Sequence, residues 1–138
     1  MIVYLDSSVV LRPLPDQPHS LPDWGRWEAA YTSELLGIEC RRVIDRLRLE
    51  SAFSDEDVAV AMERLERTER SIRRVRLTKS ILVAASRTMP TVVKTLDAFH
   101  LVTAIALRDR RHIDLLFATH DAQQATAARA LGFTCLGS

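Results

Sequence analysis

The chain has no long apolar run, few cysteines and few lysines, and each shortage excludes a class of protein. No hydrophobic stretch approaches the ~20 residues that a membrane-spanning helix needs, so we expect no membrane span. The chain reaches the carboxylate of Asp6 with no basic residue before it, so we expect no signal peptide. The composition, 47% hydrophobic and 27% charged, is typical of a globular protein and excludes disorder, a collagen-like repeat and a coiled-coil rod.

Cysteine is too scarce to build a disulfide framework, because Cys40 and Cys135 are the only two. The sequence also has no cluster of cysteine and histidine with the spacing of a structural zinc site. We therefore interpret both thiols as reduced, partly buried side chains. This interpretation predicts a cytoplasmic protein.

Lysine is nearly absent, since Lys79 and Lys94 are the only lysines and arginine supplies the rest of the 19 basic residues. The 18 acidic residues almost balance this positive charge. Arginine is preferred where a planar group must hold phosphate or carboxylate, so its excess is compatible with an anionic partner. A GC-rich coding sequence would produce the same bias without any function. Composition alone leaves both explanations open.

The length of 138 residues predicts one domain that spans residues 1–138. Apolar runs alternate with stretches of helical periodicity, which predicts a three-layer α/β/α fold with a mostly parallel central sheet. Four of the five prolines lie within residues 13–22, which predicts an irregular loop there. The predicted strands are 2–5, 72–77, 115–118 and 133–136, and the predicted helices are 34–49, 54–69, 79–88, 97–110 and 121–131.

Three acidic residues lie at predicted element boundaries. Asp6 follows the first strand, Asp97 opens an almost wholly apolar helix, and Asp121 opens the last helix. Functional groups gather beyond the carboxyl ends of parallel strands, which favours a shared site. Each residue also has a local explanation, because an aspartate at such a position can cap a helix.

A fourth carboxylate, Glu39, lies beside the apolar stripe of the helix predicted over residues 34–49. A partly buried carboxylate requires a positive partner or a metal. The local alternative is an ion pair with Arg42 or Arg46, one turn away. We interpret His100, on the polar edge of the helix that Asp97 opens, as a satisfied core histidine.

The coincidence of four such carboxylates is what predicts a function. Like charges a few ångströms apart are costly unless a cation neutralises them, and oxygen donors select Mg²⁺ or Mn²⁺. A bound divalent ion can polarise a phosphodiester and activate water for attack on it. The rest of the chain is basic, which suits a polyanionic substrate. The arginines that we place nearest to nucleic acid are Arg12, Arg73, Arg74 and Arg76.

Four segments resemble the motifs of the PIN domain family, specifically the toxin ribonucleases of VapBC toxin–antitoxin modules. They are residues 3–8 (Val-Tyr-Leu-Asp-Ser-Ser), 33–42 around Glu39, 96–104 (Leu-Asp-Ala-Phe-His-Leu-Val-Thr-Ala) and 117–121 (Phe-Ala-Thr-His-Asp). Residues 127–132 also match the usual ending. The segment 96–104 is the most specific of the set. Together these segments extend over nearly the whole chain in the family's order.

The resemblance implies a PIN-like fold and a metal-dependent endoribonuclease. By resemblance, one or two Mg²⁺ or Mn²⁺ ions are held by Asp6, Glu39, Asp97 and Asp121. Ser7 or Ser8, together with Thr119, would orient ligands and water through hydrogen bonds. Such proteins cut structured RNA, often tRNA or a ribosomal RNA loop. They form homodimers and are silenced by a VapB-type antitoxin whose C-terminal segment occupies the active site.

Three other classes of function fit this pattern less well than a nuclease. A phosphoacceptor receiver domain needs paired acids after its first strand and a late lysine, yet Ser7 and Ser8 follow Asp6 and no lysine follows Lys94. A phosphatase of the Asp-x-Asp type fails because Ser8 stands at the second acidic position. A catalytically silent PIN-like module that binds RNA or a protein is the remaining alternative, and the four carboxylates argue against it.

Overall fold

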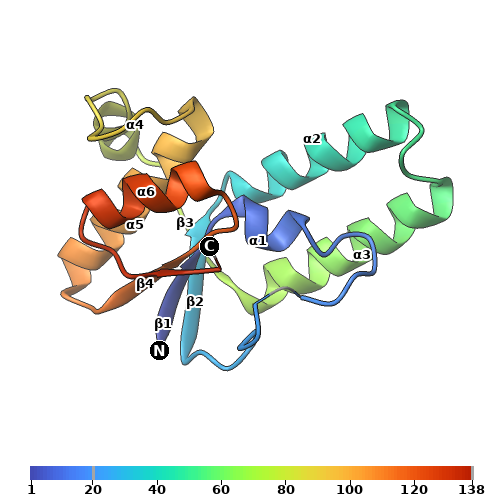
Figure 1. Ribbon diagram of the computed structural model, residues 1–138, viewed down its shortest axis with the longest axis horizontal. Coiled ribbons are helices and arrows are strands. Elements are labelled where there is room, and N and C mark those ends of the chain that lie inside the picture. Colours follow the sequence, from blue (N-terminus) through green and yellow to red (C-terminus); the bar gives the residue numbers. More distant parts are fainter. Residues whose placement is uncertain (20, 138) are drawn as a thin grey trace.

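The computed structural model describes residues 1–19 and 21–137, and it has a sheet between two groups of helices (Figure 1). In the described chain the sheet has five strands in the order β3-β2-β1-β4-β5, and every neighbouring pair is parallel. The strands are β1 (Ile2–Leu5), β2 (Ala29–Ser33), β3 (Arg73–Val75), β4 (Leu115–Ala118) and β5 (Cys135–Leu136). The helices are α1 (Ser7–Leu11), α2 (Leu36–Leu49), α3 (Asp55–Ser71), α4 (Lys79–Ala85), α5 (Thr95–Arg111) and α6 (Ala122–Ala130). The predicted three-layer α/β/α fold is confirmed.

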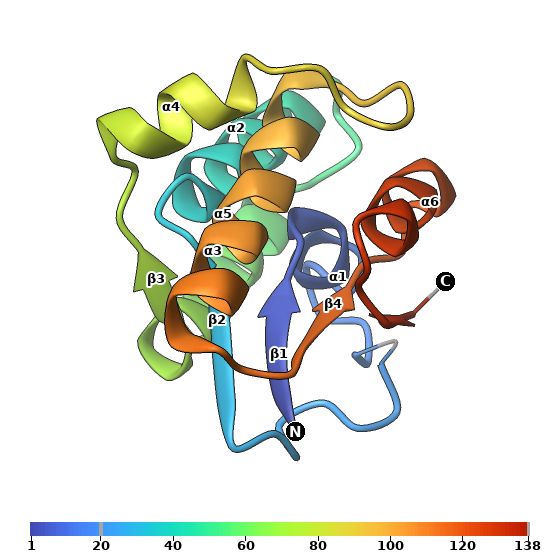
Figure 2. The same cartoon turned by 90° about the vertical axis from the view of Figure 1, so that its left-hand side faces the viewer.

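The central strand β1 divides the core because successive side chains of a strand point to opposite faces. Val3 and Leu5 pack into one apolar cluster with residues of α1, α2 and α3. Tyr4 packs into a second cluster with residues of α5 and α6. Helices therefore cover both faces of the sheet, and in Figure 2 α5 lies in front of the strands while α2 and α3 lie behind them. A sheet buried on both sides reads as a continuous apolar run, which is what residues 2–5 are.

The strand β2 was not predicted, since no predicted element lies between residues 5 and 34. In the structure Thr32 and Ser33 lie in β2, which pairs with β1 on one side and β3 on the other. The hydroxyl of Thr32 donates a hydrogen bond of 2.8 Å to the carbonyl of Leu5. The helix that follows begins at Leu36, after Ser33 Oγ accepts a hydrogen bond from the Leu35 backbone N–H. Pairing on both edges stabilises a strand whose local sequence gives only a weak signal.

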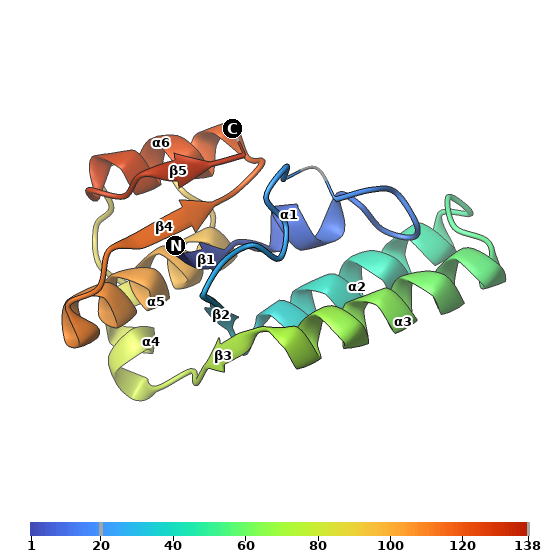
Figure 3. The ribbon, with the colours of Figure 1, turned by 90° about the horizontal axis from the view of Figure 1, so that it is seen from below.

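Other boundaries shift by a few residues. The helix predicted over residues 54–69 is confirmed as α3, and a capping box opens it, since Ser54 and Asp57 exchange side-chain-to-backbone hydrogen bonds. The described part of the proline-rich stretch contains no helix or strand, as predicted, and Ser20 lies outside the described residues. The strand predicted over residues 72–77 is limited to Arg73–Val75, the one predicted over 133–136 is limited to Cys135–Leu136, and α4 ends at Ala85 rather than near residue 88. Helices α2 and α3 run side by side beyond the sheet (Figure 3).

The parallel register gathers the carboxyl ends of the strands at one edge of the sheet. Leu5 of β1 lies opposite Ala118 of β4, so the residues that follow them, Asp6 and Thr119, become neighbours. The Asp6 N–H continues the ladder with a 3.0 Å bond to the carbonyl of Ala118. This edge is where a doubly wound sheet places functional groups.

Candidate functional site

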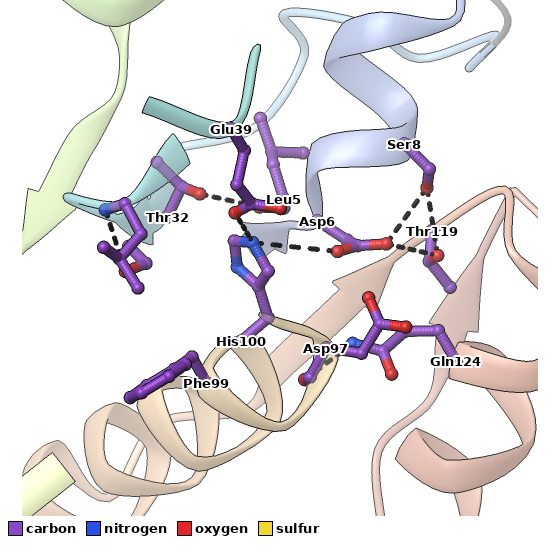
Figure 4. A network of polar contacts seen from close by, with 12 residues as sticks. Leu5, Asp6, Ser8, Thr32, Glu39, Asp97, Phe99, His100, Thr119 and Gln124 are labelled. Carbon is purple, nitrogen blue, oxygen red and sulfur yellow. Dashed lines mark hydrogen bonds and ion pairs between the residues drawn. The ribbon is translucent and has the colours of Figure 1, made fainter. Parts of the chain in front are cut away.

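The first carboxylate of the site, Asp6, is 2% exposed and is held by two hydroxyl groups. Its Oδ2 accepts hydrogen bonds from Thr119 Oγ1 at 2.7 Å and from Ser8 Oγ at 3.0 Å (Figure 4). These two hydroxyls also lie 3.1 Å from each other. Asp6 occupies the N-cap position of α1 but makes no side-chain capping bond. The capping explanation of this aspartate is therefore wrong.

Glu39 reaches the same region from the first turn of α2, and its side chain is 9% exposed. Its Oε1 lies 2.5 Å from Nε2 of His100 on α5. The alternative ion pair with Arg42 or Arg46 is not formed, because those arginines pair with Asp45 and Glu50 instead. Glu39 therefore points away from the solvent-exposed face of its helix and toward the core.

His100 connects three elements although it is completely buried. Its Nδ1 shares a 2.7 Å hydrogen bond with the hydroxyl of Tyr4 on β1, and its Nε2 lies 3.9 Å from Asp6 Oδ1. Burial alone would lower the pKa of His100. The hydrogen bond to Glu39 and the nearby carboxylate charges outweigh burial, so this pKa is raised. The imidazolium form is thus favoured between Glu39 and Asp6.

Asp97 is half-buried at the first turn of α5, and its pKa is raised from 3.8 to about 6. Burial is the main cause, and the charges of Asp6, Asp121 and Glu39 add to it. Lys94, not Asp97, is the N-cap residue of α5, so the capping explanation fails here too. The repulsion between carboxylates that the sequence predicted is therefore present in the fold.

Asp121 differs from the others because its local explanation is correct. Its Oδ1 accepts bonds from the backbone N–H groups of Gln123 and Gln124 at 2.8 and 3.2 Å, which caps α6. The Asp121 N–H donates to Thr119 Oγ1 at 3.1 Å, which fixes the residue beside Asp6. The Gln124 side chain does not complete a capping box, since its Nε2 donates to the carbonyl of Asp97 at 3.0 Å.

Comparison with known families agrees with this geometry, because the sequence pattern that defines the PIN domain matches residues 3–130. The chain belongs to the PIN domain family. The matched segment holds all four carboxylates and both hydroxyls that hold Asp6. Family membership indicates a nuclease, since PIN domains are generally nucleases. Comparison with curated proteins gave no match.

The carboxylates of this PIN domain offer oxygen donors that fit a divalent cation. Within residues 1–19 and 21–137, no three His, Cys, Asp or Glu side chains already converge closely enough to hold an ion. Nevertheless Asp6 Oδ1 is buried without a hydrogen-bond partner, which is costly for a carboxylate oxygen. The raised pKa of Asp97 shows that burial, together with the neighbouring carboxylates, disfavours the ionised form of a second carboxylate. Two such oxygen donors at one edge fit a hard cation such as those PIN domain nucleases usually use.

The remaining predicted site residues fall into two places. Ser7 makes no hydrogen bond to Asp6 and instead lines an apolar groove beside Glu39. Arg12 is close to the carboxylates, since its Nη2 donates to the carbonyl of His120 at 3.2 Å. The three arginines of residues 73–76 lie elsewhere, at the β3 edge of the sheet, where they line a separate groove. The structure therefore does not bring all four predicted arginines together.

Sequence reasoning missed two polar side chains that organise the site. Tyr4 was assigned only to an apolar strand, although it is the one residue of residues 2–5 with a polar group. His100 was correctly interpreted as a satisfied core histidine, but its partner Glu39 was not foreseen. The sequence signal for the role of His100 was its position beside Asp97 on the one polar edge of a helix that is otherwise apolar.

None of the helices within residues 1–19 and 21–137 has the length and apolar character that a membrane span requires.

Proposed function

We propose that this PIN domain is a Mg²⁺- or Mn²⁺-dependent endoribonuclease and the toxin of a VapBC toxin–antitoxin module. One observation carries the metal-dependent chemistry. Asp6 Oδ1 is buried without a hydrogen-bond partner, at an edge of the sheet where Asp97 already has a raised pKa. A divalent cation would satisfy both carboxylates. The four segments of residues 3–8, 33–42, 96–104 and 117–121 support the assignment to VapC-type toxins.

The proposed ligands are Asp6, Glu39, Asp97 and Asp121. When bound, the ion would supply Lewis-acid activation of the phosphodiester and of the attacking water. The protein's own groups prepare the carboxylates for that role. Thr119 and Ser8 orient Asp6, which leaves its Oδ1 free. His100 orients Glu39, and Tyr4 in turn fixes the ring of His100.

Cleavage of RNA by the purified chain tests this proposal. We expect structured RNA, such as tRNA or a ribosomal RNA fragment, to be cut with Mg²⁺ or Mn²⁺ and to stay intact with EDTA. Asp97→Asn should lower the rate at least ~100-fold, since it removes a ligand of the ion. Asp109→Asn is the matched control, because Asp109 is an exposed aspartate on the same helix. Mapping the ends of the products then identifies the cleavage site.

The outcomes separate the proposal from its alternative. Cleavage that survives EDTA, or that Asp97→Asn leaves undiminished, would contradict a metal-dependent site. If the chain binds RNA but never cuts it under any metal condition, the catalytically silent PIN-like module is the correct description. Toxicity on expression in cells, lost in Asp97→Asn, would support the toxin role.

We also propose a VapB-type antitoxin as partner. An apolar groove of about 550 Å³ borders Glu39, and it is lined by exposed hydrophobic side chains. These are Ile38, Leu49 and Leu96, which are 61%, 67% and 46% exposed. A segment bound there would lie beside Glu39 and block access to it. Co-expression with the product of an adjacent small gene with a DNA-binding N-terminus tests this partnership.

Two further proposals complete the functional assignment. The protein would act as a homodimer in the cytoplasm, where Cys40 and Cys135 would stay reduced; both are free in the structure. Light scattering of the purified chain measures its oligomeric state, and a monomer at all concentrations would contradict the dimer.

A further inference from the structure

A second groove lies at the opposite edge of the sheet from β5, between β3, α4 and the C-terminal part of α5. Its volume is about 310 Å³. We call it the arginine groove, after the five arginines that line it together with one tyrosine. These residues are Tyr31, Arg73, Arg74, Arg76, Arg110 and Arg111.

The positive charge of the arginine groove is almost uncompensated. Within the described residues, Arg73, Arg76, Arg110 and Arg111 form no ion pair with any carboxylate. Only Arg74 has an acidic partner, Glu69, at 3.4 Å. That carboxylate is already engaged by Arg41 at 2.7 Å. Guanidinium groups that converge without counter-ions repel one another, so the groove favours an anion.

Tyr31 holds two of these cations in position. It is only 6% exposed, and its hydroxyl accepts hydrogen bonds from Nη1 of Arg73 at 3.2 Å and from Nη1 of Arg111 at 3.5 Å. The guanidinium carbons of the same two arginines lie 5.7 and 5.9 Å from the ring centroid. These cation–π contacts restrict the conformations that both arginine side chains can adopt. A preorganised pair of guanidiniums loses less entropy when it binds a ligand.

Helix electrostatics do not explain the whole arrangement. Arg110 and Arg111 lie in the last turn of α5, where basic side chains interact favourably with the helix dipole. Arg73 and Arg76 belong to β3 and the segment that follows it, so no helix end accounts for them. Charges from two separate elements converge on one cavity, which points to a ligand.

We propose that the arginine groove binds phosphate groups of the RNA substrate at a distance from the cleavage site, an inference that rests on the proposed function. The guanidinium fork matches the geometry of phosphate oxygens. The cavity is larger than one phosphate group, which suits a stretch of backbone. Tyr31, Arg110 and Arg111 thereby join the nucleic-acid surface predicted from sequence, while Arg12 belongs to the catalytic edge.

The helix α5 sets the separation of the two sites. Asp97 lies in its first turn and Arg111 is its last residue, so at ~1.5 Å per residue they are ~20 Å apart along the axis. An RNA must therefore extend over several nucleotides to contact both. This distance predicts that a long structured RNA binds more tightly than a short fragment around the cleavage site.

Binding of a fluorescently labelled RNA stem-loop by the full chain tests the groove. The Asp97→Asn background with EDTA prevents cleavage during the titration. Arg73→Gln and Arg111→Gln should each raise Kd about fivefold to tenfold at ~0.1 M salt, and should flatten the log Kd–log salt slope by about one. Arg129→Gln on α6 is the matched control, because Arg129 is exposed, forms no ion pair with a described residue and lies by β5. Thermal unfolding checks that each variant is folded.

Each outcome decides between named explanations. Equal Kd values for the groove variants and Arg129→Gln would overturn the proposal. If inorganic phosphate binds in the groove but the groove variants bind RNA as tightly as the unaltered groove does, the groove is a small-anion site. That result would also overturn the proposal. A poly-glutamate peptide that binds more tightly than RNA, with the same dependence on Arg73 and Arg111, would assign the groove to an acidic protein. If the wild-type chain cuts no RNA while the groove variants still lose RNA binding, the nuclease proposal fails and the phosphate site stands.

Discussion

Nε2 of His100 lies 2.5 Å from Oε1 of Glu39, and this contact joins α5 to α2 across the end of the sheet. Both side chains are shielded from solvent, with exposures of 1% and 9%. Although burial lowers it, the hydrogen bond to Glu39 and the charges of Asp6 and Glu39 raise the pKa of His100, so the imidazole links two carboxylate residues that stand 33 positions apart in the chain. Asp6 Oδ1 is nevertheless a buried oxygen without a hydrogen bond.

His100→Asn should destabilise the fold by about 2–3 kcal/mol. The substitution leaves a small cavity and removes the partners of Tyr4 and Glu39 in a buried setting. Urea unfolding at pH 7 measures the change. His112→Asn is the control, because His112 is exposed and has a φ of 51°, a conformation that asparagine tolerates. Equal stability of the two variants would contradict a structural role for the His100 contacts.

Thr119→Val should reduce RNA cleavage at least ~10-fold while it changes side-chain volume little. Valine cannot donate to Asp6 Oδ2 or accept from the Asp121 N–H, so two carboxylate residues lose their orientation. The initial rate of RNA cleavage with saturating Mn²⁺ measures the effect. Thr126→Val on the exposed face of α6 provides the comparison. A Thr119→Val enzyme as active as Thr126→Val would show that this hydroxyl is dispensable.

Ser8→Ala should impair cleavage more than Ser7→Ala does. The Ser8 hydroxyl donates to Asp6 and accepts from the His120 N–H, whereas Ser7 lines the apolar groove. We expect a loss of about fivefold to tenfold for Ser8→Ala and less than ~2-fold for Ser7→Ala. Rates measured in parallel at one metal concentration decide the order, and the reverse order would assign the supporting role to Ser7.

The metal-free protein should become less stable as the pH rises from about 4 to 8. Asp97 and His100 both have raised pKa values, so the folded state binds protons more tightly than the unfolded chain. For Asp97 this stabilisation is lost as the pH rises from about 4 to above 6, and for His100 as it rises through its folded pKa. Mg²⁺ or Mn²⁺ should restore the loss, since it binds the ionised carboxylates.

Thermal unfolding with EDTA, and again with Mn²⁺, measures this dependence. Asp97→Asn should be more stable than the wild type at pH 8 without metal, by about 1 kcal/mol after allowance for solvent screening of a half-buried group. It should also gain less from added metal. A wild-type melting temperature that is flat from about pH 4 to 8 and unchanged by Mn²⁺ would contradict the charge repulsion inferred at this edge.

Leu49→Ser should weaken binding of the antitoxin and leave RNA cleavage intact. Leu49 lines the apolar groove at a distance from the carboxylates and is 67% exposed, so its loss removes apolar contact area without unfolding the chain. The control is Leu82→Ser, because Leu82 is also an exposed leucine (47%) but lies outside the groove. Co-purification with the product of the adjacent small gene gives the readout, and equal recovery with both variants would place the partner elsewhere.

Local patterns in the sequence predicted most of the elements and the identity of the acidic residues. The apolar run of residues 2–5, the proline-rich loop and the capping residues Ser54 and Asp121 depend on near neighbours in the chain, so they can be read without a structure. The strand β2 could not, because its stability comes from pairing with β1 and β3 rather than from its own residues.

The positions of the four carboxylates at element boundaries or beside an apolar stripe follow from local periodicity and turn chemistry, so they can be recognised in the primary structure. The partners of these carboxylates depend on long-range folding. The fold joins Glu39 to His100 across 61 positions and Thr119 to Asp6 across 113, and it places Arg111 beside Arg73 on the ring of Tyr31. The physical reason is that strand order and helix packing, not sequence distance, set which side chains meet in a folded chain.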